Sequence, residues 1–373
     1  MNDTRPLAAV AIRQVAKMTG ATRIALHQAQ LLSEMGFRVA IICEKGDTEL
    51  VSNHGIRLAK VTRWPFKGAF RRRWYQMRVS AWCRKNRPDL IISHGDVDTN
   101  DILFMHNCVH LAEQRIFGNR KSPSDVATIH DEILTRQSFQ KVVANSQLMA
   151  NDFKSRYAIP DEKIKIHYPG YDPKKFNLES ASRHRDSTRS DLGVNRNECL
   201  IGLVTSGNFK KRNVEFFIKL ASTLNEIEPD KFRFLVVGKG KKTEYLQQAE
   251  SAGVSDKFVW MQTVPDVEKI YGALDLFVLP AKIEEFGCVA LEAMACGIPV
   301  LLSPWVGASE LLREKFPSLI VEDENEYLWA ERLLSVIKRD SAKLGLALSA
   351  LSEEYSHEKQ REKLAAEFSQ FNK

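Results

Sequence analysis

Long apolar runs, closely spaced cysteine pairs and any excess of glycine or proline are missing from this chain of 373 residues. No window approaches eighteen consecutive apolar residues, so a membrane-spanning helix is not expected. The six cysteines lack the close spacing of a zinc site or a disulfide framework, which favours a reducing compartment. The first twenty residues have too short an apolar run for a signal peptide, and a cytoplasmic location is therefore expected.

The composition is that of a globular protein with room for more than one core. The hydrophobic fraction is 44%, which is enough to build sizeable cores, and the length predicts two or three domains. The formal net charge is +7, which favours anionic partners. Charge alone does not choose among nucleic acid, phosphate and lipid.

Short β-branched runs alternate with helical patterns along both halves of the chain. The pattern starts at residues 7–13 and starts again at 200–207, and such alternation predicts parallel sheets with right-handed crossovers. We therefore expect an α/β protein with two doubly wound domains that face a cleft. The N-terminal domain is predicted over 1–170 with a returning helix over 355–373, and the C-terminal domain over 171–354. The polar stretch 179–198 is interpreted as a loop or linker.

The segment IEEFGCVALEAMACGIPV, residues 283–300, places carboxylates where a ligand is expected. It follows a buried strand that ends near Pro280, and its second half is predicted to be a helix ended by Gly297. Glu284 then lies in the loop at the carboxyl edge of the sheet, where ligands bind in such folds, and Glu292 lies in the helix. A carboxylate accepts hydrogen bonds from sugar hydroxyls, although a partly exposed helical Glu292 without a ligand is also possible on this pattern.

Four segments in the right order resemble the family 4 (group 1) retaining glycosyltransferases of the GT-B fold. The family has Glu, seven residues, Glu, a small-residue helix and G-x-P-V, and residues 284–303 are similar to this pattern. Residues 142–153, 165–176 and 236–261 resemble three further elements of the family. The resemblance implies two Rossmann-like domains, an N-terminal domain that binds the acceptor and a C-terminal domain that binds the nucleotide sugar.

The resemblance also implies roles for single residues. It assigns Glu292 to the ribose of a nucleotide donor, Glu284 to the donor sugar, and the basic loop 205–217 to the diphosphate. Two adjacent cations can stabilise the charge of a leaving diphosphate without a metal. The donor-binding residues it implies are Lys211, Arg212, Phe286, Gly287 and Glu292, with Gly20 in the N-terminal half. The chain departs from the family at Glu285, where Gly is usual, and at Asn213, which replaces a common Gly.

A histidine near the reacting centre and the absence of a metal complete the predicted site. His106, in the segment 103–110, matches the position where many family members place a histidine, and with Glu284 it is the predicted catalytic residue. His94 and His110 are weaker candidates. Asp96 and Asp98 have the Asp-x-Asp spacing of metal-dependent glycosyltransferases of the other fold, but they lie in the acceptor-side half. No metal and no cofactor are therefore expected.

The segment 60–88 is basic and aromatic throughout. It holds ten lysines and arginines, no acid and six aromatic residues. This mixture suits an anionic membrane surface, because basic side chains are drawn to anionic lipids and aromatic rings settle at the interface. A helix over 70–86 that packs its apolar side chains inward is the structural alternative, and nucleic-acid binding is a third, although no nucleic-acid motif accompanies it.

The sequence thus predicts a hexosyltransferase that uses a nucleotide sugar, most simply a UDP-sugar. Within the family the chain looks most like bacterial lipopolysaccharide-core glucosyltransferases, which implies an envelope glycan or glycolipid acceptor and peripheral attachment to the inner membrane. A soluble acceptor is the nearest alternative. A glycoside hydrolase, which also uses paired carboxylates, and a non-enzymatic nucleic-acid-binding protein stay open as other classes.

Overall fold

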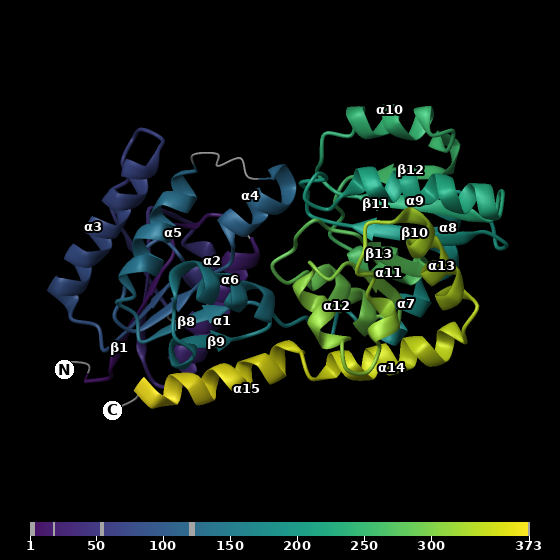
Figure 1. Ribbon diagram of the computed structural model, residues 1–373. Helices are drawn as coiled ribbons and strands as arrows, with labels where there is room; N and C mark the ends of the chain where they lie inside the picture. Colours follow the sequence, from purple (N-terminus) through teal and green to yellow (C-terminus); the bar gives the residue numbers. More distant parts are fainter. Residues whose placement is uncertain (1–3, 18, 53–55, 119–123, 372–373) are drawn as a thin grey trace. The chain divides into compact units, whose positions relative to one another are not determined.

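A computed structural model describes residues 4–17, 19–52, 56–118 and 124–371. The chain divides into two compact units, one formed by residues 1–169 with 360–373 and the other by residues 170–359 (Figure 1). Each contains a parallel sheet covered by helices on both faces, so the predicted α/β class with two doubly wound domains is confirmed. Within the described part of the chain, no helix is both long and apolar enough to cross a membrane.

The described strands of the first unit form a seven-stranded sheet in the order β5-β3-β1-β6-β7-β8-β9. Their bounds along the sheet are Arg57–Lys60, Arg38–Cys43, Leu7–Ala11, Leu90–Ser93, Ile102–Phe104, Lys141–Ala144 and Ile164–Ile166. Two short strands, β2 (Gln14–Val15) and β4 (Lys45–Gly46), pair separately. The chain order reverses between β1 and β6, and in doubly wound sheets ligands bind beyond the strand ends at such a switch point.

Helices cover both faces of this first sheet because its strands are apolar on both sides. In β1, Ala8 and Val10 belong to one buried cluster, whereas Ala9 and Ala11 belong to another. The helices are α1 (Gly20–Glu34), α2 (Glu49–Ser52), α3 (Ala69–Asn86), α4 (Val109–Phe117), α5 (Asp125–Arg136) and α6 (Gln147–Tyr157). Strands buried on both faces are continuously apolar, which is why the sequence pattern located them well.

The last helix, α15 (His357–Phe368), ends in the core of the first unit. Phe368 is fully buried in the same cluster as Val10 and Leu32, and Leu364 and Ala365 pack against that cluster. The side chain of Arg361 also pairs with Glu34 at the end of α1. The C-terminal helix therefore returns to the N-terminal unit.

The second unit has a sheet in the order β12-β11-β10-β13-β14. Along the sheet the strands are Phe258–Met261, Phe232–Val237, Cys199–Val204, Leu276–Leu279 and Val300–Leu302. Its helices are α7 (Leu178–Arg183), α8 (Arg185–Asp191), α9 (Val214–Ile227), α10 (Thr243–Ser251), α11 (Val267–Ala273), α12 (Cys288–Ala295), α13 (Glu326–Ile337) and α14 (Ser341–Glu353). Short 3-10 helices occupy Ser255–Lys257, Gly307–Leu311 and Pro317–Leu319 in this unit, and Asp161–Lys163 and Ser369–Phe371 in the first unit. The switch point here lies between β10 and β13.

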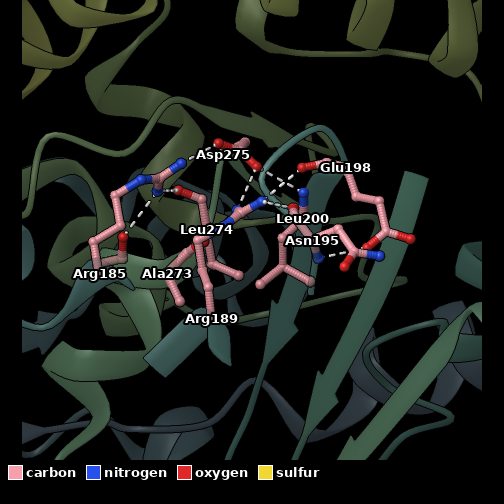
Figure 2. Close-up of polar contacts among 9 residues, drawn as sticks. Arg185, Arg189, Asn195, Glu198, Leu200, Ala273, Leu274 and Asp275 are labelled. Carbon is pink, nitrogen blue, oxygen red and sulfur yellow. Dashed lines mark hydrogen bonds and ion pairs between the residues drawn. The ribbon is translucent and has the colours of Figure 1, made fainter. Parts of the chain in front are cut away.

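The interpretation of residues 179–198 as a loop or linker is wrong. Helices α7 and α8 occupy most of this stretch and belong to the body of the second unit. Arg189 on α8 is buried, and its guanidinium donates to the carboxylate of Asp275 at 2.9 Å (Figure 2). Arg185 pairs with the same carboxylate, and Asp275 also accepts from the backbone N–H of Leu200 at 2.7 Å. Polar side chains dock these helices, so an apolar pattern could not reveal them.

Candidate functional site

The carboxylate loop of the second unit lies at the carboxyl end of β13, beside the sheet's switch point. Backbone hydrogen bonds fix it: Glu284 N–H donates to the Trp305 carbonyl at 2.8 Å, and the Phe286 carbonyl accepts from Ala308 N–H at 2.6 Å. Gly287 precedes α12 with a φ of +93°. A Cβ there would lie 3.2 Å from Glu284 Cγ, so the loop needs glycine for both backbone angle and space.

The basic loop that follows β10 meets this carboxylate loop. Lys282 N–H donates to the Lys211 carbonyl at 3.0 Å, which joins the two loops through their backbones. Their side chains then pair in order: Lys211 with Glu285, and Arg212 with Glu284. The four side chains are between 8% and 14% exposed, so the pairs are largely shielded from water. The structure thus brings together the predicted Lys211, Arg212 and Glu284, with Glu285 as an added fourth member.

The electrostatics of this charge cluster, formed by Lys211, Arg212, Glu284 and Glu285, are balanced. Burial raises the pKa of Glu284, and the charges of Arg212 and Lys211 oppose that rise while Glu285 adds to it. Among the described residues, three buried side-chain atoms of this region have no hydrogen-bond partner: the donors Arg212 Nε and Asn213 Nδ2 and the acceptor Glu284 Oε2. Buried donors are normally satisfied, so Arg212 Nε and Asn213 Nδ2 are candidates to bind the acceptor oxygens of a ligand.

Glu292 lies in α12 and bonds to a different partner. Its carboxylate accepts from the phenol of Tyr271 at 2.8 Å. Tyr271 is fully buried, and burial together with the charge of Glu292 raises the pKa of the phenol well above its usual range. Glu292 is therefore a half-buried carboxylate oriented by the Tyr271 phenol, and an ionised carboxylate is a group that can accept hydrogen bonds from sugar hydroxyls.

The predicted residues of the first unit lie at its own switch point. Gly20 is the first residue of α1, and the Thr19 side chain caps that helix by accepting from Thr22 N–H at 3.2 Å. A Cβ at Gly20 would meet nothing within 4 Å, so the described structure does not require glycine there. His106 follows β7 and is partly exposed.

His106 is the outer member of a hydrogen-bonded chain. Its Nε2 lies 2.8 Å from His94 Nδ1, and His94 Nε2 lies 3.1 Å from Gln28 Oε1. Burial lowers the pKa of His106 to about 4 and that of His94 well below its usual range, so both rings are neutral at pH 7. The three side chains thus form a continuous hydrogen-bonded chain, and its donor and acceptor roles depend on the tautomers of the two rings.

The two aspartates of the Asp-x-Asp spacing form ion pairs with arginines. Asp96 pairs with Arg72, and Asp98 with Arg136 at 2.8 Å. Within the described ranges, no group of three or more His, Cys, Asp or Glu side chains is placed to hold a metal ion. That the reaction needs no metal stays a prediction.

The segment 60–88 is partly structural and partly exposed. On α3, Tyr75 and Val79 are buried against the sheet of the first unit, as the structural alternative requires. Outside this core lies a ring cluster in which Trp64 contacts Phe70, Trp74 and Phe66 at centroid distances of 4.7, 5.4 and 6.1 Å. Phe66 and Phe70 are 69% and 49% exposed. Trp64 and Trp74 are half-buried, so the exposed part of the cluster is formed by Phe66 and Phe70.

Several contacts of the site were beyond sequence reasoning. Glu285 appeared only as a departure from the family pattern, and its pairing with Lys211 depends on β10 and β13 being neighbours. Tyr271 and Gln28 carried no motif at all. The available signal was that two loops carry equal and opposite charge, Lys-Arg at 211–212 and Glu-Glu at 284–285.

Comparisons with known domains and with known proteins agree that the chain is similar to glycosyltransferases. Residues 18–175 match the domain described as Glycosyltransferase Family 4, and residues 201–339 match Glycosyl transferases group 1. The chain is 27% identical over 220 residues to an uncharacterized glycosyltransferase of Methanocaldococcus jannaschii, covering 58% of this chain and 56% of that protein. It is 26% identical over 246 residues to the D-inositol 3-phosphate glycosyltransferase of Salinispora arenicola, covering 62% and 54%. The chain thus spans about half the length of these relatives.

Solved structures extend the similarity to nearly the whole fold. WaaG, a glycosyltransferase involved in lipopolysaccharide biosynthesis, superposes with a TM-score of 0.76 at 19% identity over 96% of this chain and 98% of that one. HepE of Anabaena, solved in complex with UDP and glucose, gives 0.74 at 18% identity over 97% and 99%. Each of these likenesses shows the fold, and the fold is GT-B.

Proposed function

The chain carries the two domains of a glycosyltransferase, and on that premise we propose that it moves a hexose from a nucleotide sugar, most simply a UDP-sugar, to a glycan or glycolipid acceptor. The observation that carries the proposal is the charge cluster at the switch point of the second unit. Lys211 and Arg212 are largely buried there, and Arg212 Nε and Asn213 Nδ2 have no acceptor among the residues that the structure describes. A diphosphate supplies the acceptor oxygens that such donors need.

The remaining residues have roles that follow from their surroundings. Glu292 would accept from ribose hydroxyls, and Glu284 would accept from the donor sugar. His106 is neutral, and its Nδ1 is the ring nitrogen not engaged with His94, so it can bind a hydroxyl of the substrate. The family resemblance favours retention of configuration, in which the leaving phosphate takes the acceptor's proton on the same face of the sugar. The loop 205–217 needs no metal to stabilise the leaving group, because two cations serve it.

The acceptor is proposed to lie at a membrane surface. The exposed rings of Phe66 and Phe70 lie among exposed basic side chains such as Arg63, Lys67 and Arg78. Basic side chains draw a protein toward anionic lipid, and exposed rings anchor it at the interface. The similarity to WaaG favours a lipopolysaccharide-type acceptor, whereas a soluble acceptor is the alternative.

One assay series tests the proposed reaction. The purified protein is incubated with labelled UDP-glucose, UDP-galactose and UDP-N-acetylglucosamine in the presence and absence of membrane glycolipid extract. We expect acceptor-dependent release of UDP and a product whose anomeric configuration, read by NMR, matches the donor. Transfer with inverted configuration would contradict the retaining mechanism. Hydrolysis of a preformed glycoside without any nucleotide would replace the proposal by a hydrolase.

The role of Arg212 is tested by nucleotide length. Arg212→Ala should weaken binding of UDP more than binding of UMP, because UMP lacks the second phosphate. Calorimetry on both nucleotides measures the two losses. An equal loss for UMP and UDP would assign Arg212 to the structure of the loop instead.

A further inference from the structure

Glu285 places a second negative charge in a cluster that already contains one. Its carboxylate pairs with Lys211, while Glu284 pairs with Arg212. Two cations and two carboxylates leave the cluster with no net charge. With an uncharged residue at 285, the same cluster would carry one positive charge and Lys211 would face the site unpaired.

The carboxylate of Glu285 is held in place. Glu285 is 6% exposed, and the loop that carries it is fixed on both sides by backbone hydrogen bonds. On one side Lys282 N–H donates to the Lys211 carbonyl at 3.0 Å, and on the other Gly307 N–H donates to the Glu284 carbonyl at 2.9 Å. Moving a side chain that is confined in this way costs free energy, unlike moving an exposed counterion at the surface.

Two donors beside these ion pairs have no partner, although Lys211 and Arg212 are each paired with a carboxylate. They are the guanidinium Nε of Arg212 and the amide Nδ2 of Asn213, both buried and both without a partner within the described residues. The two donors can bind acceptor oxygens of a ligand. A diphosphate that binds here would accept hydrogen bonds from these donors, but it would also lie close to the Glu285 carboxylate that is paired with Lys211.

We propose that Glu285 sets the affinity of the diphosphate site. Its carboxylate forms an ion pair with Lys211 and therefore competes with the entering phosphate for that cation. This inference rests on the proposed function of the loop as a diphosphate site. A phosphate that approaches Lys211 is repelled by Glu285 in a largely buried place, where charges interact more strongly than in water. The competition weakens binding of the donor and of the product nucleotide alike, and so assists product release.

The alternative is that Glu285 strengthens diphosphate binding by positioning Lys211. If Glu285 only held the Lys211 ammonium in its binding position, removal of the carboxylate charge would loosen Lys211 and weaken diphosphate binding. Competition predicts tighter binding, and positioning predicts weaker binding. The direction of the change therefore separates the two.

The test uses inorganic pyrophosphate, which carries the charge of the donor without its base or sugar. Glu285→Gln keeps the shape of the side chain and removes its charge. We expect it to bind pyrophosphate and UDP on the order of tenfold more tightly than the wild-type chain, by calorimetry. Glu228→Gln is the matched control, because Glu228 pairs with Lys231 in the same unit, at the far end of α9 from the basic loop. The control should leave both affinities unchanged.

A second background ties the effect to Lys211. In Lys211→Gln the gain from Glu285→Gln should disappear, because the cation that both anions share is gone. Glu285→Ala serves as a second variant if Glu285→Gln folds poorly, as judged by its thermal unfolding, and should shift affinity in the same direction. Unchanged or weaker pyrophosphate binding in a folded variant overturns the inference alone. Failure of the wild-type chain to bind pyrophosphate, UDP or any nucleotide sugar overturns the proposed function and this inference together.

Discussion

The phenol of Tyr271 donates to the carboxylate of Glu292 across 2.8 Å, from a fully buried ring to a half-buried helix residue. The ring is packed edge-on against Phe176 and Phe277, with centroids 6.0 and 6.2 Å away. Tyr271 is thus fixed by packing, and its hydroxyl sets the direction in which the Glu292 side chain points. A carboxylate in an otherwise apolar helix is thus oriented by a buried phenol, and carboxylates are strong acceptors for ligand hydroxyls.

We predict that Glu292→Gln weakens UDP binding by about 1.5–3 kcal/mol, the range for a hydrogen bond to a charged group. The amide still accepts from Tyr271, so the fold should persist and the loss should appear in calorimetry with UDP. Tyr271→Phe is the companion variant, expected to cost about 1 kcal/mol of unfolding free energy and to affect UDP binding less. UDP affinity unchanged in Glu292→Gln would remove the ribose assignment.

A stability prediction concerns Asp275, at the amino end of β13 and so opposite to the carboxylate loop at its carboxyl end. Asp275 precedes β13 and accepts from Arg189 Nη1 at 2.9 Å and from Leu200 N–H at 2.7 Å, besides its pair with Arg185. Asp275→Ala would leave the buried Arg189 without its anion, at a cost of about 3 kcal/mol in unfolding free energy. Chemical denaturation of the second unit measures this. Nucleotide affinity of the folded protein should not change, and a change would mean that this network reaches the site.

The contrast between these two networks shows what the sequence could predict. Strands such as Cys199–Val204 and the helix Cys288–Ala295 follow from apolar runs and from Gly287 and Gly297, which are local signals. Helices α7 and α8 escaped prediction because Asp275, which anchors α8, is more than eighty residues further along the chain. Likewise Glu285 could be seen as unusual, but its pairing with Lys211 depends on the order of strands. Local sequence patterns were enough to predict these strands and helices. They could not predict polar contacts between residues that lie far apart in the chain.

A pH prediction concerns His130 in the first unit. Burial, aided by the charge of Arg72, lowers its pKa from about 6.5 to about 3, while Asp131 acts in the opposite direction. Between these values the unfolded chain binds a proton that the folded chain does not. The unfolding free energy therefore falls as the pH drops below 6.5, by ~2 kcal/mol for this residue at pH 5.

His130→Gln should remove that contribution. Urea unfolding at pH 7.5 and pH 5 measures the acid-induced loss for the wild-type chain and the variant, and the variant should lose less. An equal loss in the wild-type chain and the variant would mean that His130 takes up its proton in the folded state.

The last prediction concerns the membrane and begins with which side chains to change. Arg71, Arg72 and Arg73 are poor choices, because Arg71 donates to the carbonyl of Phe66 at 2.8 Å, Arg72 pairs with Asp96 and Arg73 pairs with Glu132. Their loss would disturb the first unit itself. Phe66 and Phe70 are exposed, and Arg63 and Lys67 are exposed beside them, so these four can be changed with little effect on the fold.

If the segment docks on anionic lipid, charge and aromatic area should contribute separately. Arg63→Ser with Lys67→Ser should weaken binding to anionic vesicles by about 1 kcal/mol per residue at low salt, and less at high salt, where the charges are screened. Phe66→Ser with Phe70→Ser should weaken it at both salt concentrations, because ring burial does not depend on salt.

Tyr327→Ser, an equally exposed ring in the second unit, is the control. Co-sedimentation with anionic and neutral vesicles provides the measurement. A wild-type chain that binds neither vesicle type would favour a soluble acceptor. Binding to RNA in place of vesicles would point to nucleic acid, whose phosphates and bases also contact basic and aromatic side chains.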